Sequence, residues 1–200
     1  MRTAAFDRAY FDRFYERQDT RVHGRREIAR LARGTVAMIA WLGGRIDSVL
    51  DVGAGAGLWR DWFKRHRPEV KYTSTDVSAY ACERYGHELR DVSTWRSKDR
   101  HDLVVCQGVL PYLTDEAAAS AIDNIGAMAR GFLYLEAITA RDLRDVCDLD
   151  MTDVAVHPRD GAWYRARLAK HFRQVGCGLY YSRKGGLRFY ELEVPEDSKR

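Results

Sequence analysis

The segment from residue 49 to 57 carries the strongest chemical signal in the sequence, because an apolar stretch runs into glycine at every second position. It reads Val-Leu-Asp-Val-Gly-Ala-Gly-Ala-Gly, and its acid is Asp51. A glycine-rich turn between a strand and a helix brings backbone N–H groups close to a ligand, since no Cβ atoms stand in the way. The turn lacks the Gly-Lys-Ser/Thr of a P-loop, and the third glycine of a dinucleotide fingerprint would fall on Leu58.

Two further acids follow the next predicted strands. Asp76 ends the stretch 70–75, and Asp91 follows a shorter stretch over 87–90. A carboxylate in the first place can accept hydrogen bonds from both hydroxyls of a ribose, and one in the second from an adenine amino group. With the glycine turn, these acids predict an adenosine pocket at the carboxyl ends of the strands. Two structural alternatives stay open: Asp76 caps the helix that begins near Ser78, and Asp91 is an ordinary turn residue.

Strands that alternate with helices must position these residues. Apolar stretches predict strands over 48–52, 70–75, 87–90, 103–106 and 132–135. Helical spacing and capping residues predict helices over 58–66, 79–85, 114–128 and 161–173. This alternation is typical of a parallel sheet with helices on both faces. Two β-rich runs around Lys184-Gly185-Gly186 predict that the sheet finishes with an antiparallel hairpin.

Composition and charge narrow the class of protein. The chain has 200 residues, of which 46% are hydrophobic, enough for one domain with a substantial core. No run of about 18 apolar residues occurs, so we expect no membrane-spanning helix. The charged first 19 residues do not resemble an export signal, and the four cysteines form no Cys-x-x-Cys pair. We therefore expect a cytoplasmic protein with reduced thiols and no zinc site.

Residues 1–45 are predicted to be helical and carry a charge of +5, whereas the remainder of the chain carries −1. Their arginines are interleaved with Asp7, Asp12, Glu16 and Asp19. Such a pattern is more typical of a mixed, solvated helix face than of a polyanion site, which argues against a nucleic-acid partner.

The sequence from about residue 47 to 194 resembles the class I S-adenosylmethionine-dependent methyltransferases, on the glycine turn, Asp76, the Asp91-Val92 pair and the segment 106–112 (Cys-Gln-Gly-Val-Leu-Pro-Tyr). The resemblance implies a Rossmann-like α/β fold with a seven-stranded, mostly parallel sheet, an antiparallel C-terminal hairpin and helices on both faces. It implies S-adenosylmethionine as cofactor and S-adenosylhomocysteine as product. The cofactor-binding residues expected from it are Asp51, Gly53, Gly55, Gly57, Asp76, Val77, Asp91, Val92, Gln107 and Gly108.

The fourth-strand segment also bears on the methyl acceptor. Family members that methylate adenine amino groups resemble Asp/Asn-Pro-Pro-aromatic here, and those that methylate cytosine carbon use Pro-Cys. This chain has Gln107-Gly108-Val109-Leu110, and no proline precedes Cys106. The resemblance therefore favours an oxygen or nitrogen nucleophile of a small metabolite. A protein or RNA methyltransferase and a non-catalytic cofactor-binding or scaffold domain remain alternatives, and the misplaced third glycine counts against a nicotinamide oxidoreductase.

Residues beyond the fourth and fifth strands are candidates for the acceptor chemistry. The predicted catalytic residues are Tyr112, Glu136 and His157, of which the histidine suits a general base. The predicted acceptor contacts are Tyr15, Arg159, Trp163 and Tyr164. Packing or an ordinary hydrogen bond is the competing interpretation for each of them. The acids at 148, 150 and 153 are more typical of a solvated loop than of a metal site, so no metal is expected.

We expect a single domain over 1–200 with three parts. These are a helical lid over 1–45, a cofactor-binding half over 46–137, and an acceptor-side segment with the hairpin over 138–200. In the family such an N-terminal extension often folds over the cofactor, which would bring Tyr10, Tyr15, His23 and Arg25 to it. Arg25 would then pair with the methionine carboxylate. The alternative is a helix packed on the sheet edge with solvent-facing arginines, and the oligomeric state stays open.

Overall fold

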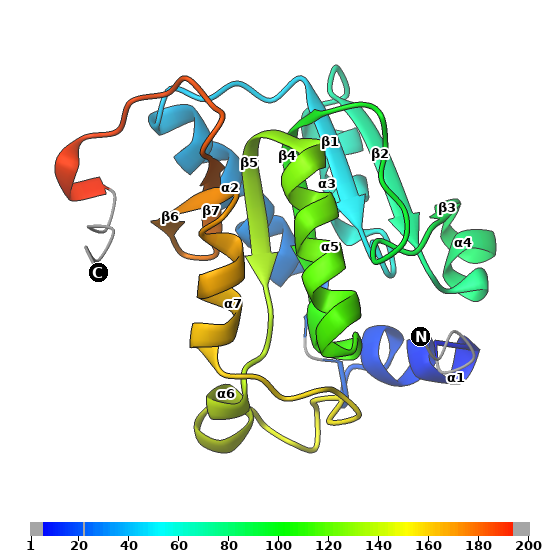
Figure 1. Ribbon diagram of the computed structural model, residues 1–200. Coiled ribbons are helices and arrows are strands. Elements are labelled where there is room, and N and C mark those ends of the chain that lie inside the picture. The colour runs from blue at the N-terminus through cyan, green and yellow to red at the C-terminus, as the bar shows by residue number, and fades with distance from the viewer. Residues whose placement is uncertain (1–5, 22, 194–200) are drawn as a thin grey trace.

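The computed structural model describes residues 6–21 and 23–193, and its centre is one seven-stranded sheet (Figure 1). The strand order is β3-β2-β1-β4-β5-β7-β6. The strands are β1 (Ser48–Val52), β2 (Lys71–Asp76), β3 (Glu88–Leu89), β4 (His101–Gln107), β5 (Ala129–Glu136), β6 (Phe172–Gly176) and β7 (Leu179–Ser182). The first five strands pair in parallel, whereas β7 pairs antiparallel with both β5 and β6. The predicted fold class is confirmed.

Helices cover both faces of this sheet, as predicted (Figure 1). The α-helices are α1 (Arg8–Phe11), α2 (Arg25–Trp41), α3 (Leu58–His66), α4 (Ala79–Tyr85), α5 (Asp115–Met128), α6 (Ala140–Asp145) and α7 (Gly161–Leu168). The shorter or irregular turns are the π-helix η2 (Asp12–Glu16) and the 3₁₀ helices η3 (Leu110–Tyr112) and η4 (Glu191–Glu193).

Alternating side chains of the central strands divide the core in two. Leu50 and Val104 pack with α5 and α7 on one face, and Val49 and Val105 pack with α2 and α3 on the other. All four are fully buried, which explains why these strands read as continuous apolar runs. Since α2 contributes to this core through buried residues such as Ile28 and Ile39, the helix over 25–41 is a layer of the fold and not a cover.

The C-terminal hairpin lies elsewhere than predicted. Helix α7 ends at Leu168, β6 and β7 follow, and the turn between them is Cys177-Gly178 and not Lys184-Gly186. Cys177 and Gly178 both have left-handed backbone, with φ of 49° and 76°, as a tight turn between two strands requires. The helical prediction to 173 overlaps the first two residues of β6, and residues 187–190 form no strand.

The carboxyl ends of the parallel strands meet on one side of the molecule, the lower side in Figure 1, where α1, η2 and α6 also lie. The strand order reverses between β1 and β4, which are direct neighbours in the sheet. Open α/β sheets bind ligands in the crevice outside the strand ends at such a switch point.

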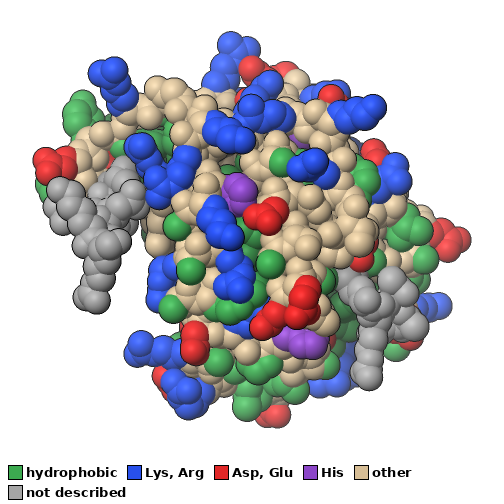
Figure 2. Space-filling view, in the orientation of Figure 1, with side chains coloured by type: hydrophobic (Ala, Val, Ile, Leu, Met, Phe, Trp, Pro, Cys, Tyr) green, Lys and Arg blue, Asp and Glu red, His purple; other side chains and the backbone are tan. Residues whose placement is uncertain are grey.

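The surface carries both signs of charge. Figure 2 shows acidic and basic side chains interspersed over the viewed face. Within the described residues, 6–21 and 23–193, no helix is both long enough and apolar enough to cross a membrane.

Candidate cofactor and acceptor site

The glycine turn joins β1 to α3 in left-handed backbone. Gly53, Gly55 and Gly57 have φ values of 66°, 57° and 72°, which residues with a side chain rarely adopt. At Gly53 a Cβ atom would also collide with Cγ2 of Val109. The alternation of glycine in the sequence therefore reflects both a conformational demand and a close approach to the segment after β4.

A buried histidine that the sequence analysis missed supports this turn. The His87 Nε2–H donates to the carbonyl of Gly55 at 3.0 Å, and Nδ1 accepts from the Ser74 hydroxyl at 2.8 Å. Burial lowers the pKa of His87 against the opposing effect of the bond to Gly55, so the neutral ring with this tautomer is favoured. His87 is thus a positioning residue for the turn.

The carboxylate of Asp76 is tied to the same turn. It is buried, and it accepts from the backbone N–H of Gly55 at 2.9 Å and of Ser78 at 2.8 Å. The helix that follows is capped by Ser78, whose hydroxyl oxygen accepts from Ala81 N. Asp76 is therefore not the cap, and each of its oxygens keeps a lone pair for a further donor.

Two cavities lie at the strand ends and share part of their walls. The smaller, of about 60 Å³, is lined by Asp76 and Val77, and the larger, of about 160 Å³, reaches Asp51, Glu136 and Asp153. Six residues line both: Tyr10, Tyr15, Gly53, Gln107, Gly108 and Tyr112. The glycine turn and the end of β4 thus form the junction between the two cavities.

Asp51 has an unusual ionisation in this setting. The carboxyl is 2% exposed and accepts a hydrogen bond of 2.7 Å from the Tyr72 hydroxyl. Burial raises the pKa of Asp51 to about 7, although the bond from Tyr72 lowers it. A cation placed in the larger cavity would favour the charged form of this carboxyl.

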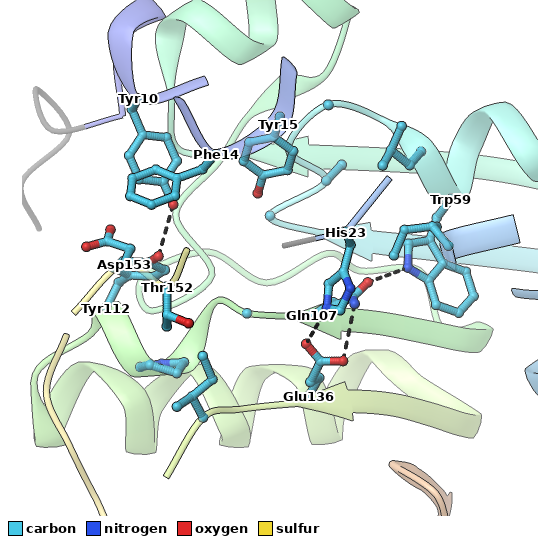
Figure 3. Close-up of a pocket in the computed structure, with 18 of the residues that line it drawn as sticks. Tyr10, Phe14, Tyr15, His23, Trp59, Gln107, Tyr112, Glu136, Thr152 and Asp153 are labelled. Atoms are coloured by element: carbon cyan, nitrogen blue, oxygen red, sulfur yellow. Dashed lines mark hydrogen bonds and ion pairs between the residues drawn. The ribbon is translucent and has the colours of Figure 1, made fainter. Parts of the chain in front are cut away.

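A polar network forms one end of the larger cavity (Figure 3). Trp59 Nε1–H donates to Gln107 Oε1 at 2.8 Å, and Gln107 Nε2–H donates to Glu136 at 3.2 Å. His23 Nε2 lies 3.8 Å from the other oxygen of Glu136. This pairing raises the pKa of His23, and with Tyr134 and Gln107 it lowers the pKa of Glu136 against the effect of burial. Glu136 is held as an anion.

Aromatic rings form the opposite end of this cavity. Tyr10 and Phe14, from α1 and η2, face Tyr112 and Asp153 (Figure 3). The Tyr10 and Tyr112 hydroxyls are 2.9 Å apart. Burial raises the pKa of Tyr112 far above its ordinary value, so this hydroxyl does not act as a base near neutral pH.

The structure does not bring all predicted acceptor residues to the cavities. His157 is exposed, and its backbone N–H donates to the Pro111 carbonyl. Arg159 is buried and binds Asp115 at 2.7 Å and the carbonyl of Leu110 at 3.1 Å, which fastens the loop before α7 to η3. The two rings that follow also serve packing: Trp163 stacks under Arg159 and Arg167, and Tyr164 belongs to the core.

Four predicted cofactor contacts also line neither cavity, namely Arg25, Gly57, Asp91 and Val92. Arg25 is mostly exposed and forms an ion pair of 2.9 Å with Asp61 of α3. It therefore does not reach the place where it was expected to bind the methionine carboxylate. Asp91 accepts from the backbone N–H and the hydroxyl of Ser93, as a turn residue does. Val92 is buried in the core under α5.

The sequence analysis missed several lining residues, namely Phe14, Trp59, Thr152 and Asp153. Trp59 and Phe14 look like ordinary helix-packing residues in a sequence. Asp153 is predicted as part of a solvated loop, whereas it lines the larger cavity. In the described part of the chain no group of three His, Cys, Asp or Glu side chains is arranged to hold a metal ion. Only the fold shows that the loop after α6 returns to the strand ends.

Comparison with known proteins settles the family. Residues 15–191 match the family described as a methyltransferase domain. The chain belongs to this family. The match covers the glycine turn, the C-terminal hairpin and most of the residues that line the two cavities. It confirms the predicted enzyme class, the S-adenosylmethionine-dependent methyltransferases. No curated protein matches the chain.

Solved structures share the fold of this methyltransferase at low sequence identity. An S-adenosylmethionine-dependent methyltransferase from Clostridium acetobutylicum is 13% identical, with a TM-score of 0.59 over 78% of this chain and 91% of that one. Magnesium protoporphyrin IX methyltransferase from Synechocystis, with bound S-adenosylmethionine, is 17% identical, with a TM-score of 0.54 over 90% and 91%. The N-methyltransferase NodS from Bradyrhizobium japonicum, in complex with S-adenosylhomocysteine, is 19% identical, with a TM-score of 0.52 over 76% and 87%.

Proposed function

We propose that this protein transfers the methyl group of S-adenosylmethionine to an oxygen or nitrogen nucleophile of a small metabolite. The observation that carries the proposal is the pair of cavities that meet at Gly53 and Gly108. The smaller one is lined by Asp76, the acid expected to bind the ribose. The larger one extends past the glycine turn to residues of the acceptor-side loop. The two cavities thus provide neighbouring places for a donor and an acceptor, once the aromatic rings over the smaller cavity have moved aside.

The residues present fit this cofactor. Asp76 has free lone pairs at the end of β2, and these could accept hydrogen bonds from the ribose hydroxyls. Val77 lies beside it in the same cavity. Gly53 and Gly55 line the smaller cavity, so their backbone lies where a ligand would come close. Asp51 and Glu136 would face the positive charges of the methionine part, and Gln107 and Gly108 would lie next to the methyl group. Gly57 supports the site indirectly, since it is the N-cap of α3.

The reaction asks mainly for positioning. The bound sulfonium supplies an activated methyl group, so this chain must align a nucleophile with it and exclude water. The rings of Tyr10, Tyr15 and Tyr112 close the junction of the cavities. Of the predicted catalytic residues, Glu136 and Tyr112 stay in the proposal as contacts of the donor and acceptor, and His157 is not carried into it because it is exposed outside the cavities. The lid also stays a proposal, for residues 6–16 only.

Calorimetric titration with S-adenosylmethionine and S-adenosylhomocysteine tests the proposal. Wild type should bind both, and Asp76→Asn should weaken binding by about 2 to 3 kcal/mol, the value of lost hydrogen bonds to a charged group. Asp99→Asn, an exposed acid before β4, serves as the control. A thermal melt of each variant separates lost binding from lost folding. If wild type bound neither compound, the proposal would fail.

A further inference from the structure

The aromatic end of the larger cavity contains a carboxylate that has no role in the reaction proposed above. Asp153 lies in the loop after α6 and faces Tyr10, Phe14 and Tyr112 (Figure 3). Its Oδ1 accepts from Ala155 N at 2.9 Å, a bond within its own loop, and it interacts with the Tyr112 hydroxyl. The neighbouring Thr152 is buried in the same wall.

The charges around this cavity are unbalanced. Three carboxylates line it, those of Asp51, Glu136 and Asp153. Asp51 is bonded to Tyr72, and Glu136 has His23, Gln107 and Tyr134 as partners. Asp153 makes no ion pair with any residue in 6–21 or 23–193, and no lysine or arginine of these ranges lines the cavity.

This combination selects for a cation. An ammonium group gains a charge-assisted hydrogen bond from a carboxylate and further attraction from the faces of aromatic rings. A carboxylate or phosphate on the acceptor would meet only like charge, at a cost that grows as the cavity excludes water. S-adenosylmethionine brings a net charge of about +1, and together with a charged His23 this offsets Glu136 and the ionised form of Asp51. Asp153 is then left without a positive partner among the described residues.

We propose that the methyl acceptor is a small amine, held as its ammonium by Asp153 among Tyr10, Phe14 and Tyr112, and that the amine nitrogen is the nucleophile. This inference rests on the proposed function, whose acceptor class it narrows. The ammonium first passes one proton to the Asp153 carboxylate, which is half-buried and returns it to solvent. The nitrogen lone pair then forms a bond to the methyl carbon while the sulfur–methyl bond breaks and its electron pair stays on sulfur. The products are the methylated ammonium and S-adenosylhomocysteine.

Three probes with one skeleton and different head groups test the inference: 2-phenylethylamine, 2-phenylethanol and phenylacetate. Binding is measured on the full chain saturated with S-adenosylhomocysteine, and turnover with S-adenosylmethionine labelled in the methyl group. The amine should bind at least about tenfold more tightly than the alcohol, phenylacetate should not bind, and only the amine should be methylated.

Matched variants assign the effect to Asp153. Asp153→Asn should raise KM for the amine at least about tenfold and remove the preference for it over the alcohol, with binding of S-adenosylhomocysteine unchanged. Asp150→Asn, an exposed acid of the same loop that lines neither cavity, should behave as wild type. Tyr112→Phe keeps the ring and should retain the preference for the amine.

The outcomes separate the two proposals. If wild type fails to bind S-adenosylhomocysteine and S-adenosylmethionine, the proposed function itself fails. If they bind but the alcohol or phenylacetate is preferred, if none of the three probes binds, or if Asp153→Asn handles the amine as wild type does, the amine inference alone is overturned.

Discussion

At the scale of single residues, the buried carboxyl of Asp51 couples cofactor binding to pH. Burial raises the pKa of Asp51 to about 7, so near neutral pH much of this group is protonated. A cationic ligand in the adjoining cavity favours the anion and so expels the proton. Binding of S-adenosylmethionine should therefore tighten as pH rises through 7 and should release protons.

Calorimetry at pH 6, 7 and 8, in buffers of different ionisation enthalpy, measures this release directly. Asp51→Asn should flatten the pH dependence and weaken binding by about 1.5 to 3 kcal/mol at pH 8, since a charged partner is lost. His23→Gln is the control, because the pKa of His23 is raised as well. Loss of its positive charge as pH rises would remove a repulsion and would therefore also tighten the binding of a cation. A pH dependence that persisted in Asp51→Asn but vanished in His23→Gln would assign the effect to the histidine.

The residues that sequence reasoning placed well are those at strand ends. Asp76 and Gln107 end parallel strands, and Asp51 is one residue from the end of another. Because the carboxyl ends of such strands meet at one edge, neighbours in the site can be predicted from local patterns alone. Loop residues offer no such rule. His157 and Asp153 are four positions apart, yet one is exposed and the other lines the cavity, because the return of the loop depends on contacts of Arg159 with η3.

At the scale of elements, the glycine turn is set by its contact with the segment after β4. Gly53→Ala would force a side chain into left-handed backbone and against Val109 Cγ2. We expect a loss of stability of about 1 to 3 kcal/mol and at least a tenfold loss in affinity for S-adenosylmethionine. Urea unfolding and calorimetry measure the two effects.

Two further variants separate the causes. Val109→Ala in the Gly53→Ala background should recover the part of the loss that is steric, and the part due to the positive φ should remain. Gly34→Ala, in the exposed middle of α2 with no atom near the new Cβ, should instead stabilise the protein by about 0.5 to 1 kcal/mol. Equal effects at positions 34 and 53 would contradict this account of the turn.

The elements themselves were predictable where a strand is buried on both faces or a helix has a clear cap. Ser78 caps α4 and Thr114 caps α5 as their residue types predict. The hairpin was misplaced because Phe172 begins a strand only four residues after α7 ends, inside the stretch predicted as helical. Its turn also uses Cys177 in a left-handed conformation that cysteine seldom adopts. Pairing with β5 decides this region, and no local pattern encodes that pairing.

At the scale of the whole molecule, His101 lowers stability at the end of the sheet opposite the site. It is 4% exposed, and neither ring nitrogen has a hydrogen-bond partner among the described residues. His101→Phe should stabilise the protein by about 1 kcal/mol at pH 7, since a buried polar group is removed and an apolar ring of similar shape fills its place.

The gain should grow in acid. Burial lowers the pKa of His101, so the unfolded chain binds the proton more readily and the wild type loses stability as pH falls below about 6.5. The variant lacks this loss, so urea titrations at pH 7 and 5.5 should show a larger difference at the lower pH. A difference that stayed constant would mean that the ring is hydrated or bonded in solution.

The N-terminal segment should close over the bound cofactor. Phe6, Tyr10, Phe11 and Tyr15 line the small cavity beside Asp76. These rings must move aside before a nucleoside can enter, and they can then return to cover it.

Cleavage by trypsin after Arg13 and Arg17, in and just after η2, reports on this opening. With S-adenosylhomocysteine at 100 times its Kd, cleavage there should slow by up to about a hundredfold if opening releases the ligand. Cleavage after Lys184, which lines neither cavity, is the internal reference. Equal slowing at all three sites would show that global unfolding and not a lid limits cleavage, and unchanged rates with bound ligand would rule the lid out.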